Sequence, residues 1–142
     1  MPSHELHCAQ LANLTRYSPR PVTWTITDAA APGVTTGELD SIARDVLADN
    51  KATSSFLGYK AHGAVPYPGV ICASVNHEVV HGIPGDRVLR EGDQISIDCG
   101  AILSGWHGDA AITVGVGEVA AEAVELSRVT EEALWRGLAA VR

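Results

Sequence analysis

Two apolar stretches joined by a short connection within residues 95–113 constrain the fold of this chain more than any other feature. Their length and spacing predict a β-hairpin, and a register that pairs Ile102 with Gly105 also pairs Asp98 with Asp109. Directly opposed residues have Cβ atoms about 4.5–5.5 Å apart, so such carboxylates repel unless a positive group lies between them. Two metal ions about 3.5–4 Å apart would suit the pair. The hairpin is therefore predicted to carry half of a dinuclear metal site.

Each aspartate also has an ordinary structural explanation. Asp98 could cap a turn at residues 99–100, and Asp109 could lie at the surface. Four apolar neighbours suggest instead that both strands are buried: Ile95, Ile97, Ala111 and Ile112. Buried carboxylates are rarely left unpaired, and no Lys or Arg occurs between Arg90 and Arg128. Either a metal ion or a distant partner must then neutralise the pair.

His81 follows two valines and has two competing interpretations. It could be a core histidine bonded to the backbone, or a neutral imidazole near the metals that bonds a substrate carbonyl or a developing oxyanion. The other histidines of this region are expected in loops or at the surface: His62, His77 and His107. Cys72 and Cys99 are expected to be small apolar fillers, because no base accompanies them in the sequence.

Composition excludes several classes of function. The chain is 46 % hydrophobic and 19 % charged, which is ordinary for one globular domain of 142 residues. A net charge of −7 without any basic run argues against nucleic acid as a partner. No apolar run is long enough to cross a bilayer, and the first residues do not resemble a secretory signal. Three scattered cysteines make neither a disulfide framework nor a zinc ribbon, so we expect a cytoplasmic protein.

The order of predicted elements is helix, antiparallel strands, helix, which indicates an α+β fold. Residues 23–27 are predicted to form a short strand, and Thr35 with Glu38 a capping box that starts a helix ending near Asn50. Strands are predicted at residues 70–75 and 79–81, before the hairpin. A last helix is predicted over residues 118–142. Its apolar stripe requires something to pack against.

Several blocks of sequence resemble the type I methionine aminopeptidases, in the same order along the chain. They are residues 55–59 (SFLGY), 71–76 (ICASVN), 78–87 (EVVHGIPGDR), 91–93 (EGD), 96–100 (SIDCG) and 105–111 (GWHGDAA). The resemblance implies a pita-bread fold, in which two pseudo-symmetric α+β halves surround two divalent metal ions (Co, Mn, Fe or Zn). It also implies removal of the initiator methionine from nascent polypeptides, with the ribosome as the expected place of action, by attack of a bridging water on the peptide carbonyl.

The resemblance assigns a role to six residues. Asp98 matches a ligand of one metal, and Asp109 matches the aspartate that bridges both. His81 matches the histidine that contacts the substrate and stabilises the transition state. Tyr59, Cys72 and, less strongly, Phe56 match walls of the pocket for the methionine side chain.

The chain also departs from the family pattern. The family's remaining ligands, one His and two Glu, have no counterpart here, and two carboxylates cannot fill the coordination of two transition metals. The segment between Tyr59 and Cys72 is longer than usual, so His62 and Tyr67 receive no role. Residues 1–29 do not match the family. We therefore expect residues 30–142 to be the N-terminal half of a truncated catalytic domain that is inactive alone and self-associates through its exposed midline.

The sequence leaves two other functions open. A pita-bread scaffold without metal could be a binding module, since a fold alone does not determine function. A prolidase-like or aminopeptidase P-like hydrolase would share the carboxylates of the hairpin. The block that contains Cys72 and His81 favours methionine specificity, and this choice depends on the resemblance.

Overall fold

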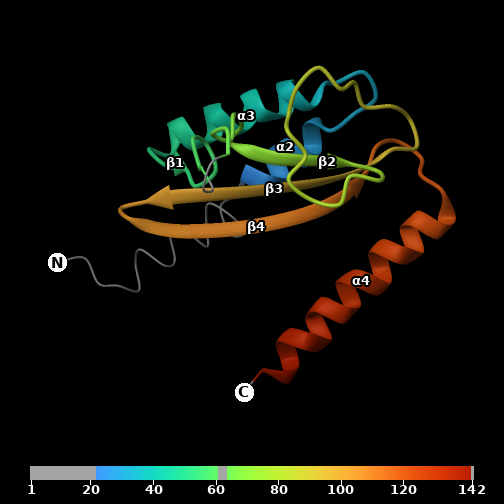
Figure 1. Cartoon of the computed structure of the whole chain (residues 1–142). Coiled ribbons are helices and arrows are strands. Elements are labelled where there is room, and N and C mark those ends of the chain that lie inside the picture. The colour runs from blue at the N-terminus through green and yellow to red at the C-terminus, as the bar shows by residue number, and fades with distance from the viewer. Residues whose placement is uncertain (1–21, 61–63, 142) are drawn as a thin grey trace.

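The computed structural model describes residues 22–60 and 64–141. Along the chain it contains α2 (Val22–Ala29), α3 (Thr36–Asp49), β1 (Thr53–Ser54), β2 (Ile71–Val75), β3 (Gln94–Leu103), β4 (Trp106–Gly115) and α4 (Ala121–Ala140). Helices α2 and α3 lie on one face of an antiparallel sheet, and α4 extends away from the sheet (Figure 1). This arrangement confirms the predicted α+β class.

Strand β3 is the centre of the sheet. It pairs with β4 along its whole length, and its other edge pairs with β2 over residues 95–99 and with β1 over residues 101–102. Alternate side chains of a strand point to opposite faces. One set is buried in the core beside α2 and α3: Ile95, Ile97, Cys99 and Ala101. We call the opposite face, toward which Asp98 and Gly100 project, the open face.

The predicted hairpin is confirmed, but the predicted register is wrong by two residues. Ser104 and Gly105 form a two-residue turn with φ of 53° and 84°, and Leu103 pairs with Trp106. Turns with positive φ at both central residues match the twist of the flanking strands, whereas other short turns splay them. The physical requirement for such a turn therefore overrides the register proposed from the pattern of apolar residues.

In the observed register Asp109 lies opposite Gly100, and Asp98 lies opposite Ala111. Because a shift of two residues preserves the face of every side chain, both aspartates still project from the open face. They are diagonal neighbours rather than a directly opposed pair. The expectation that both strands are buried is wrong for β4, where Asp109 and Ala111 are exposed and Ile112 is half-buried.

Helix α3 begins and ends as predicted. The Thr35 hydroxyl accepts a hydrogen bond from the Glu38 amide at 3.1 Å, and the Glu38 carboxylate accepts one from the Thr35 amide at 2.7 Å. The helix ends at Asp49, and the amide of the capping residue Asn50 donates a hydrogen bond to the Val46 carbonyl. Three of its predicted apolar positions are fully buried: Leu39, Ala43 and Leu47. This burial fixes the helix on the core face of the sheet.

Two predicted strands are absent. Residues 23–27 belong to helix α2, because Ile26 is completely buried among residues of the core and this packing overrides the β-propensity of the threonines. Residues 79–81 have no strand partner among the described residues. Val79 and Val80 are exposed, and His81 has a φ of 59°, which is incompatible with an extended strand. Residues 1–21 lie outside the described residues.

Helix α4 confirms the predicted last helix, although it starts at Ala121 rather than near residue 118. None of its described residues is buried. It is attached to the sheet through Gln94, whose side-chain amide donates to the Ala123 carbonyl at 3.2 Å and to the Ser127 hydroxyl at 3.0 Å. Within the described part of the chain, no helix is both long and apolar enough to cross a membrane.

Candidate metal centre

The open face brings the two predicted metal ligands together. Asp98 lies in the middle of β3, between Cys72 on β2 and Ala111 on β4. Asp109 projects from the same face of β4, opposite Gly100. Diagonal neighbours of this kind have Cβ atoms about 7–8 Å apart or slightly less, so two carboxylates reaching toward one another can approach closely. A cation placed between them could therefore contact both.

The electrostatics of Asp98 are those of a carboxyl without a compensating charge. The pKa of Asp98 is raised to about 6, first by burial and then by the charge of Asp109 and a hydrogen bond with that residue, while the charge of His81 opposes this shift. Its Oδ1 atom is buried and has no hydrogen-bond partner. None of the ion pairs found in the described residues includes either aspartate. A buried, unpartnered carboxylate oxygen is a costly feature unless a ligand uses it.

The donor atoms at this position fit a divalent cation in part. Carboxylate oxygens from Asp98 and Asp109 are suitable ligands for Mg²⁺ and Mn²⁺ and contribute to mixed sites for other metals. Among the described residues, however, no group of three or more His, Cys, Asp or Glu side chains is arranged to hold a metal ion. The described residues thus supply two ligands of a site that needs further donors.

His81 lies beside this pair but is not a core histidine. Its side chain is exposed, which excludes the alternative that it is buried and satisfied by the backbone. Its charge acts on Asp98, so the imidazole lies within electrostatic reach of that carboxylate. The residue is held on a left-handed backbone with a φ of 59°. An exposed imidazole within electrostatic reach of Asp98 is available to a ligand, whereas a core histidine is not.

Cys72 and Tyr67 form one wall of the open face. Cys72 is buried opposite Asp98, and burial is the main cause that raises its pKa, with the two aspartates acting in the same direction. The Tyr67 hydroxyl contacts Cys72, and its pKa is also raised, chiefly by burial. Burial raises the pKa of Cys99 to about 12. Both thiols therefore remain protonated near neutral pH, as expected for fillers rather than nucleophiles.

Tyr67 is the residue of this region that the sequence did not identify. Its hydroxyl lies 3.0 Å from the Ile71 carbonyl and 2.9 Å from the Gly82 carbonyl. Its amide donates to the Tyr59 carbonyl at 2.9 Å. A tyrosine between two prolines, at positions 66 and 68, was the available signal, because such a segment has a restricted backbone.

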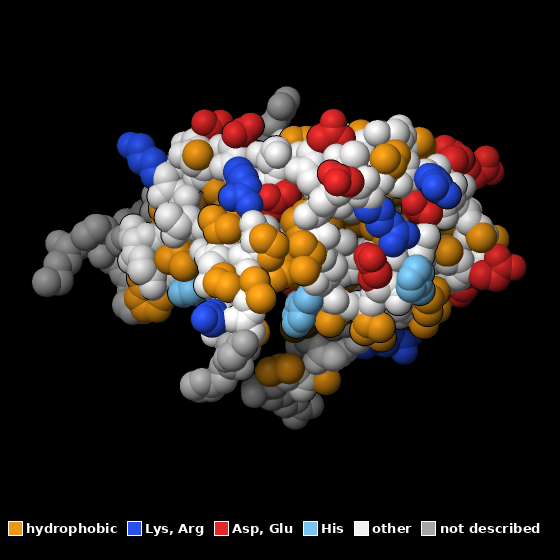
Figure 2. Space-filling model, turned by 45° about the horizontal axis from the view of Figure 1, so that its top comes forward, with side chains coloured by type: hydrophobic (Ala, Val, Ile, Leu, Met, Phe, Trp, Pro, Cys, Tyr) orange, Lys and Arg blue, Asp and Glu red, His pale blue; other side chains and the backbone are white. Residues whose placement is uncertain are grey.

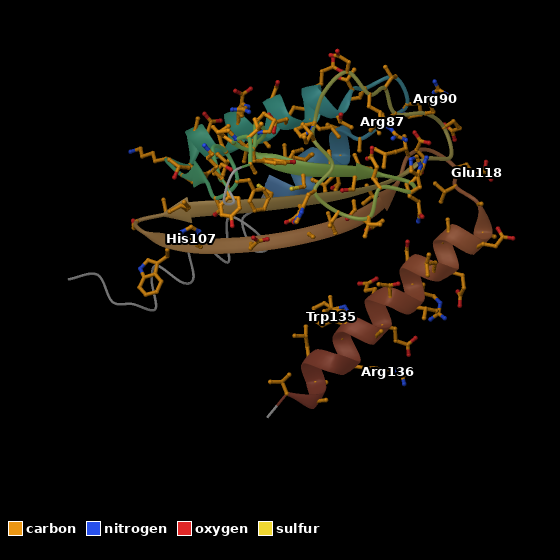
Figure 3. All side chains as sticks on the ribbon, viewed as in Figure 1. Arg87, Arg90, His107, Glu118, Trp135 and Arg136 are labelled. Atoms are coloured by element: carbon orange, nitrogen blue, oxygen red, sulfur yellow. The ribbon has the colours of Figure 1, made fainter. Side chains whose placement is uncertain are left out.

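The remaining predicted residues take different places. Phe56 lies over Gly100, where an added Cβ would come within 2.8 Å of its ring, so it borders the carboxylate pair. Tyr59 is 67 % exposed and is tied to the region by backbone hydrogen bonds with Tyr67 and Phe56. His107 lies on β4 near the hairpin turn, and its Nδ1 is 3.0 Å from the Ser55 hydroxyl (Figure 3). His62 lies outside the described residues.

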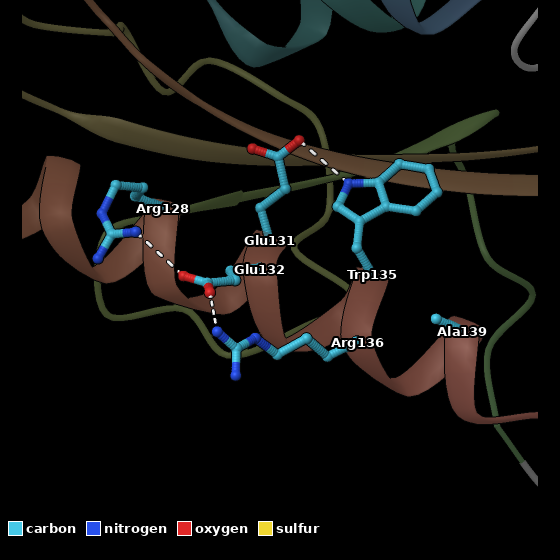
Figure 4. A pocket seen from close by; sticks show the side chains of 6 residues that line it. All are labelled: Arg128, Glu131, Glu132, Trp135, Arg136 and Ala139. Atoms are coloured by element: carbon cyan, nitrogen blue, oxygen red, sulfur yellow. Dashed lines mark hydrogen bonds and ion pairs between the residues drawn. The ribbon is translucent and has the colours of Figure 1, made fainter.

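A shallow hollow along α4 is unrelated to this centre. It is lined by side chains of that helix alone: Arg128, Glu131, Glu132, Trp135, Arg136 and Ala139 (Figure 4). Arg128 and Arg136 both pair with Glu132, and Glu131 balances the remaining positive charge of the lining. The hollow contains neither aspartate of the open face, and its arrangement is that of an exposed helix surface.

Comparison with known proteins places this geometry in a family. The model of Peptidase_M24, metallopeptidase family M24, matches residues 57–142, which is more than half of the chain and includes Asp98, Asp109 and His81. The chain belongs to metallopeptidase family M24. The carboxylate pair therefore lies within the region that this family shares.

Individual members of family M24 show how far the likeness extends. The chain is 55 % identical over 114 residues to methionine aminopeptidase 1 of Mycobacterium tuberculosis, covering 80 % of this chain and 41 % of that protein. A solved methionine aminopeptidase from Rickettsia prowazekii superposes with a TM-score of 0.82 at 33 % identity, covering 95 % of this chain and 52 % of that one. The chain thus spans about two fifths of the length of the curated relatives it matches.

The fold is shared more widely than the sequence. An Xaa-Pro dipeptidase from Bacillus anthracis superposes with a TM-score of 0.69 at 24 % identity, over 91 % of this chain and 32 % of that one. This likeness concerns the fold alone. Together with the methionine aminopeptidase structure, it shows that the described residues adopt part of the pita-bread architecture predicted from the sequence.

Proposed function

We propose that this chain takes part in the removal of N-terminal methionine from newly made polypeptides in the cytoplasm. The buried, unpartnered oxygen of Asp98 beside Asp109 carries the proposal, because it is a feature that a metal ligand explains and a scaffold does not. The choice of methionine over other N-terminal residues is supported by the identity of 55 % to a protein named methionine aminopeptidase 1.

Asp98 and Asp109 would hold divalent metal, two ions of Co, Mn, Fe or Zn according to the resemblance. When bound, such metal would activate water and polarise the peptide carbonyl. His81, exposed beside the pair, would donate a hydrogen bond to the substrate where negative charge develops. Cys72, Tyr59 and Phe56 would border the methionine side chain.

We further propose that residues 30–142 are the N-terminal half of a catalytic domain. The relatives that align with this part of the chain are longer, and the match covers 41 % of the protein from M. tuberculosis and 42 % of the one from Clostridium acetobutylicum. The absence of a third metal ligand in the described residues agrees with this division. The missing donors would have to come from another segment or from a second copy that meets the open face.

The first experiment measures methionine release from a Met-Ala-Ser peptide by the purified chain while Mn²⁺ or Co²⁺ is titrated. Asp109→Asn removes a proposed ligand, and Asp45→Asn, an exposed aspartate on α3, serves as the matched control. Release that depends on metal and disappears only in Asp109→Asn supports the proposal. Absence of release together with absence of Mn²⁺ binding by calorimetry would overturn it.

The competing function is that of a binding module without metal. It stays a prediction, because a fold alone does not determine function. In such a module the carboxylate pair is only a source of repulsion, so replacing both Asp98 and Asp109 by Asn should stabilise the protein regardless of added metal. A metal site predicts the opposite order of stability once Mn²⁺ is added, because only the unmodified chain gains stability from the ion.

A further inference from the structure

His81 has a backbone conformation that an ordinary residue adopts only when its surroundings enforce it. Its φ is 59°, in the left-handed region that residues with a Cβ occupy rarely. The neighbouring valines do not enforce it, because Val79 is 87 % exposed and Val80 is 65 % exposed. The residue that follows, Gly82, is by contrast hydrogen-bonded to its surroundings.

Gly82 is held by three hydrogen bonds, two of them to β2 and one to Tyr67. Its amide donates to the Ser74 hydroxyl at 3.0 Å, and its carbonyl accepts from the Ala73 amide at 2.9 Å and from the Tyr67 hydroxyl at 2.9 Å. The approach is so close that an added Cβ would lie 2.4 Å from the Ala73 carbonyl oxygen. Only glycine fits here. The bond to Ser74 uses the N–H of the peptide group that joins His81 to Gly82, so that peptide group is fixed.

The segment is also anchored at both ends. Upstream, the Glu78 carboxylate accepts from the Val75 amide at 2.7 Å and pairs with Arg87 at 3.2 Å. Downstream, the Gly85 amide donates to the Thr36 hydroxyl at 2.9 Å, at the start of α3. Between these anchors Val79, Val80 and Ile83 are exposed. Figure 2 shows hydrophobic side chains at the surface of the molecule among acidic, basic and histidine side chains. The hydrogen bonds of Gly82 thus determine the position of His81.

We propose that Ser74 and Tyr67 are positioning residues that hold His81 beside the carboxylate pair by fixing the Gly82 peptide. The proposal rests on the proposed function, in which His81 contacts the substrate. Ser74 projects from the same face of β2 as Cys72, and the Tyr67 hydroxyl contacts Cys72 while bonding Gly82. The wall of the site and its histidine are therefore joined through one phenol and one serine hydroxyl.

The test uses nuclear magnetic resonance on the full chain with Ser74→Ala, Tyr67→Phe and the double variant. Ser41→Ala, which removes a hydrogen bond confined to α3, is the matched control. Loss of one hydrogen bond should speed exchange of the Gly82 amide in Ser74→Ala by roughly five- to tenfold. The strong cross-peak between the amide and Hα protons of His81, which reports positive φ, should weaken in each variant and most in the double one.

A second readout tests position rather than fold. Substoichiometric Mn²⁺ should broaden the His81 ring signals of the unmodified chain, and the variants should lose most of this broadening while the signals of Ala110 and Ala111 stay broadened. An unchanged His81 cross-peak in the double variant, or undiminished broadening of its ring, would overturn the proposal. If Mn²⁺ broadens nothing near Asp98 in the unmodified chain, the proposed function fails, and the backbone readout still decides the role of Ser74 and Tyr67.

Discussion

Replacing Asp98 by Asn should stabilise the metal-free protein at neutral pH and have little effect in acid. Folding raises the pKa of this carboxyl from an ordinary 3.8 to about 6, mainly through burial and then through the charge of Asp109. The folded state therefore binds a proton that the unfolded state has already released between these values. The stability associated with that proton is complete below pH 3.8 and is lost as the pH rises through 6.

The magnitude follows from the same displacement. If the carboxyl were fully shielded from solvent, the shift in its pKa from 3.8 to about 6 would lower the stability of the protein by about 3 kcal/mol at neutral pH, since each pKa unit corresponds to about 1.4 kcal/mol. Asp98 is only half-buried, so solvent screening reduces the expected loss to about 1–2 kcal/mol. Asp98→Asn avoids this loss, and it should be more stable than the unmodified chain by that amount at pH 7.5.

Urea unfolding in EDTA at pH 4 and pH 7.5 measures the difference, with Asp45→Asn as a control for the loss of one exposed carboxylate. Saturating Mn²⁺ should reverse the order at pH 7.5, because ligand at one hundred times its Kd adds about 2.7 kcal/mol only to a chain that binds it. If Asp98→Asn is less stable than the unmodified chain at pH 7.5 without metal, the inferred repulsion is refuted.

Three further predictions concern the frame around the site. Gly100→Ala should lose about 1–3 kcal/mol of stability in thermal unfolding, because the new Cβ would lie 2.8 Å from both Phe56 and Ser55; a neutral effect would mean that this wall is loose. Thr35→Ala should cost about 1 kcal/mol through loss of the capping box, whereas Ser41→Ala, inside the same helix, should cost less. Cys99, with a pKa near 12 and a buried side chain, should react with a thiol reagent only on unfolding, and fast labelling of Cys99 itself in the native chain, located by peptide mapping, would contradict its position in the core.

The sequence predicted the elements whose signals are local. The capping box at Thr35, the apolar spacing of α3 and the hairpin with both aspartates on one face all follow from patterns within a few residues. The prediction of the register was wrong because the register depends on whether Leu103–Ser104 or Ser104–Gly105 forms the turn. Both choices keep the same side chains on each face of the hairpin. A strand was predicted where helix α2 forms, because burial of Ile26 by distant segments outweighs local β-propensity.

The least predictable part of the site is the contact of Tyr67 and Ser74 with Gly82. These residues are 15 and 8 positions from it, and their bonds form only after β2 has been placed in the sheet. No periodicity in the sequence encodes such a contact. The family resemblance identified His81 as important, but only the folded structure shows what holds its backbone.

The turn at Ser104 and Gly105 sets the distance along β4 at which Asp109 meets β3. Asp109 is separated from the turn by a fixed number of residues, so the length of the connection, rather than any contact between the aspartates, determines whether they meet. One inserted residue between the turn and Asp109 would send that side chain to the core face. Substitutions at Ser104 and Gly105 should therefore be tolerated wherever positive φ is kept, whereas insertions and deletions should abolish the pairing of the carboxylates. Libraries that vary the turn in residue identity and in length would separate the requirement for turn conformation from the requirement for turn length.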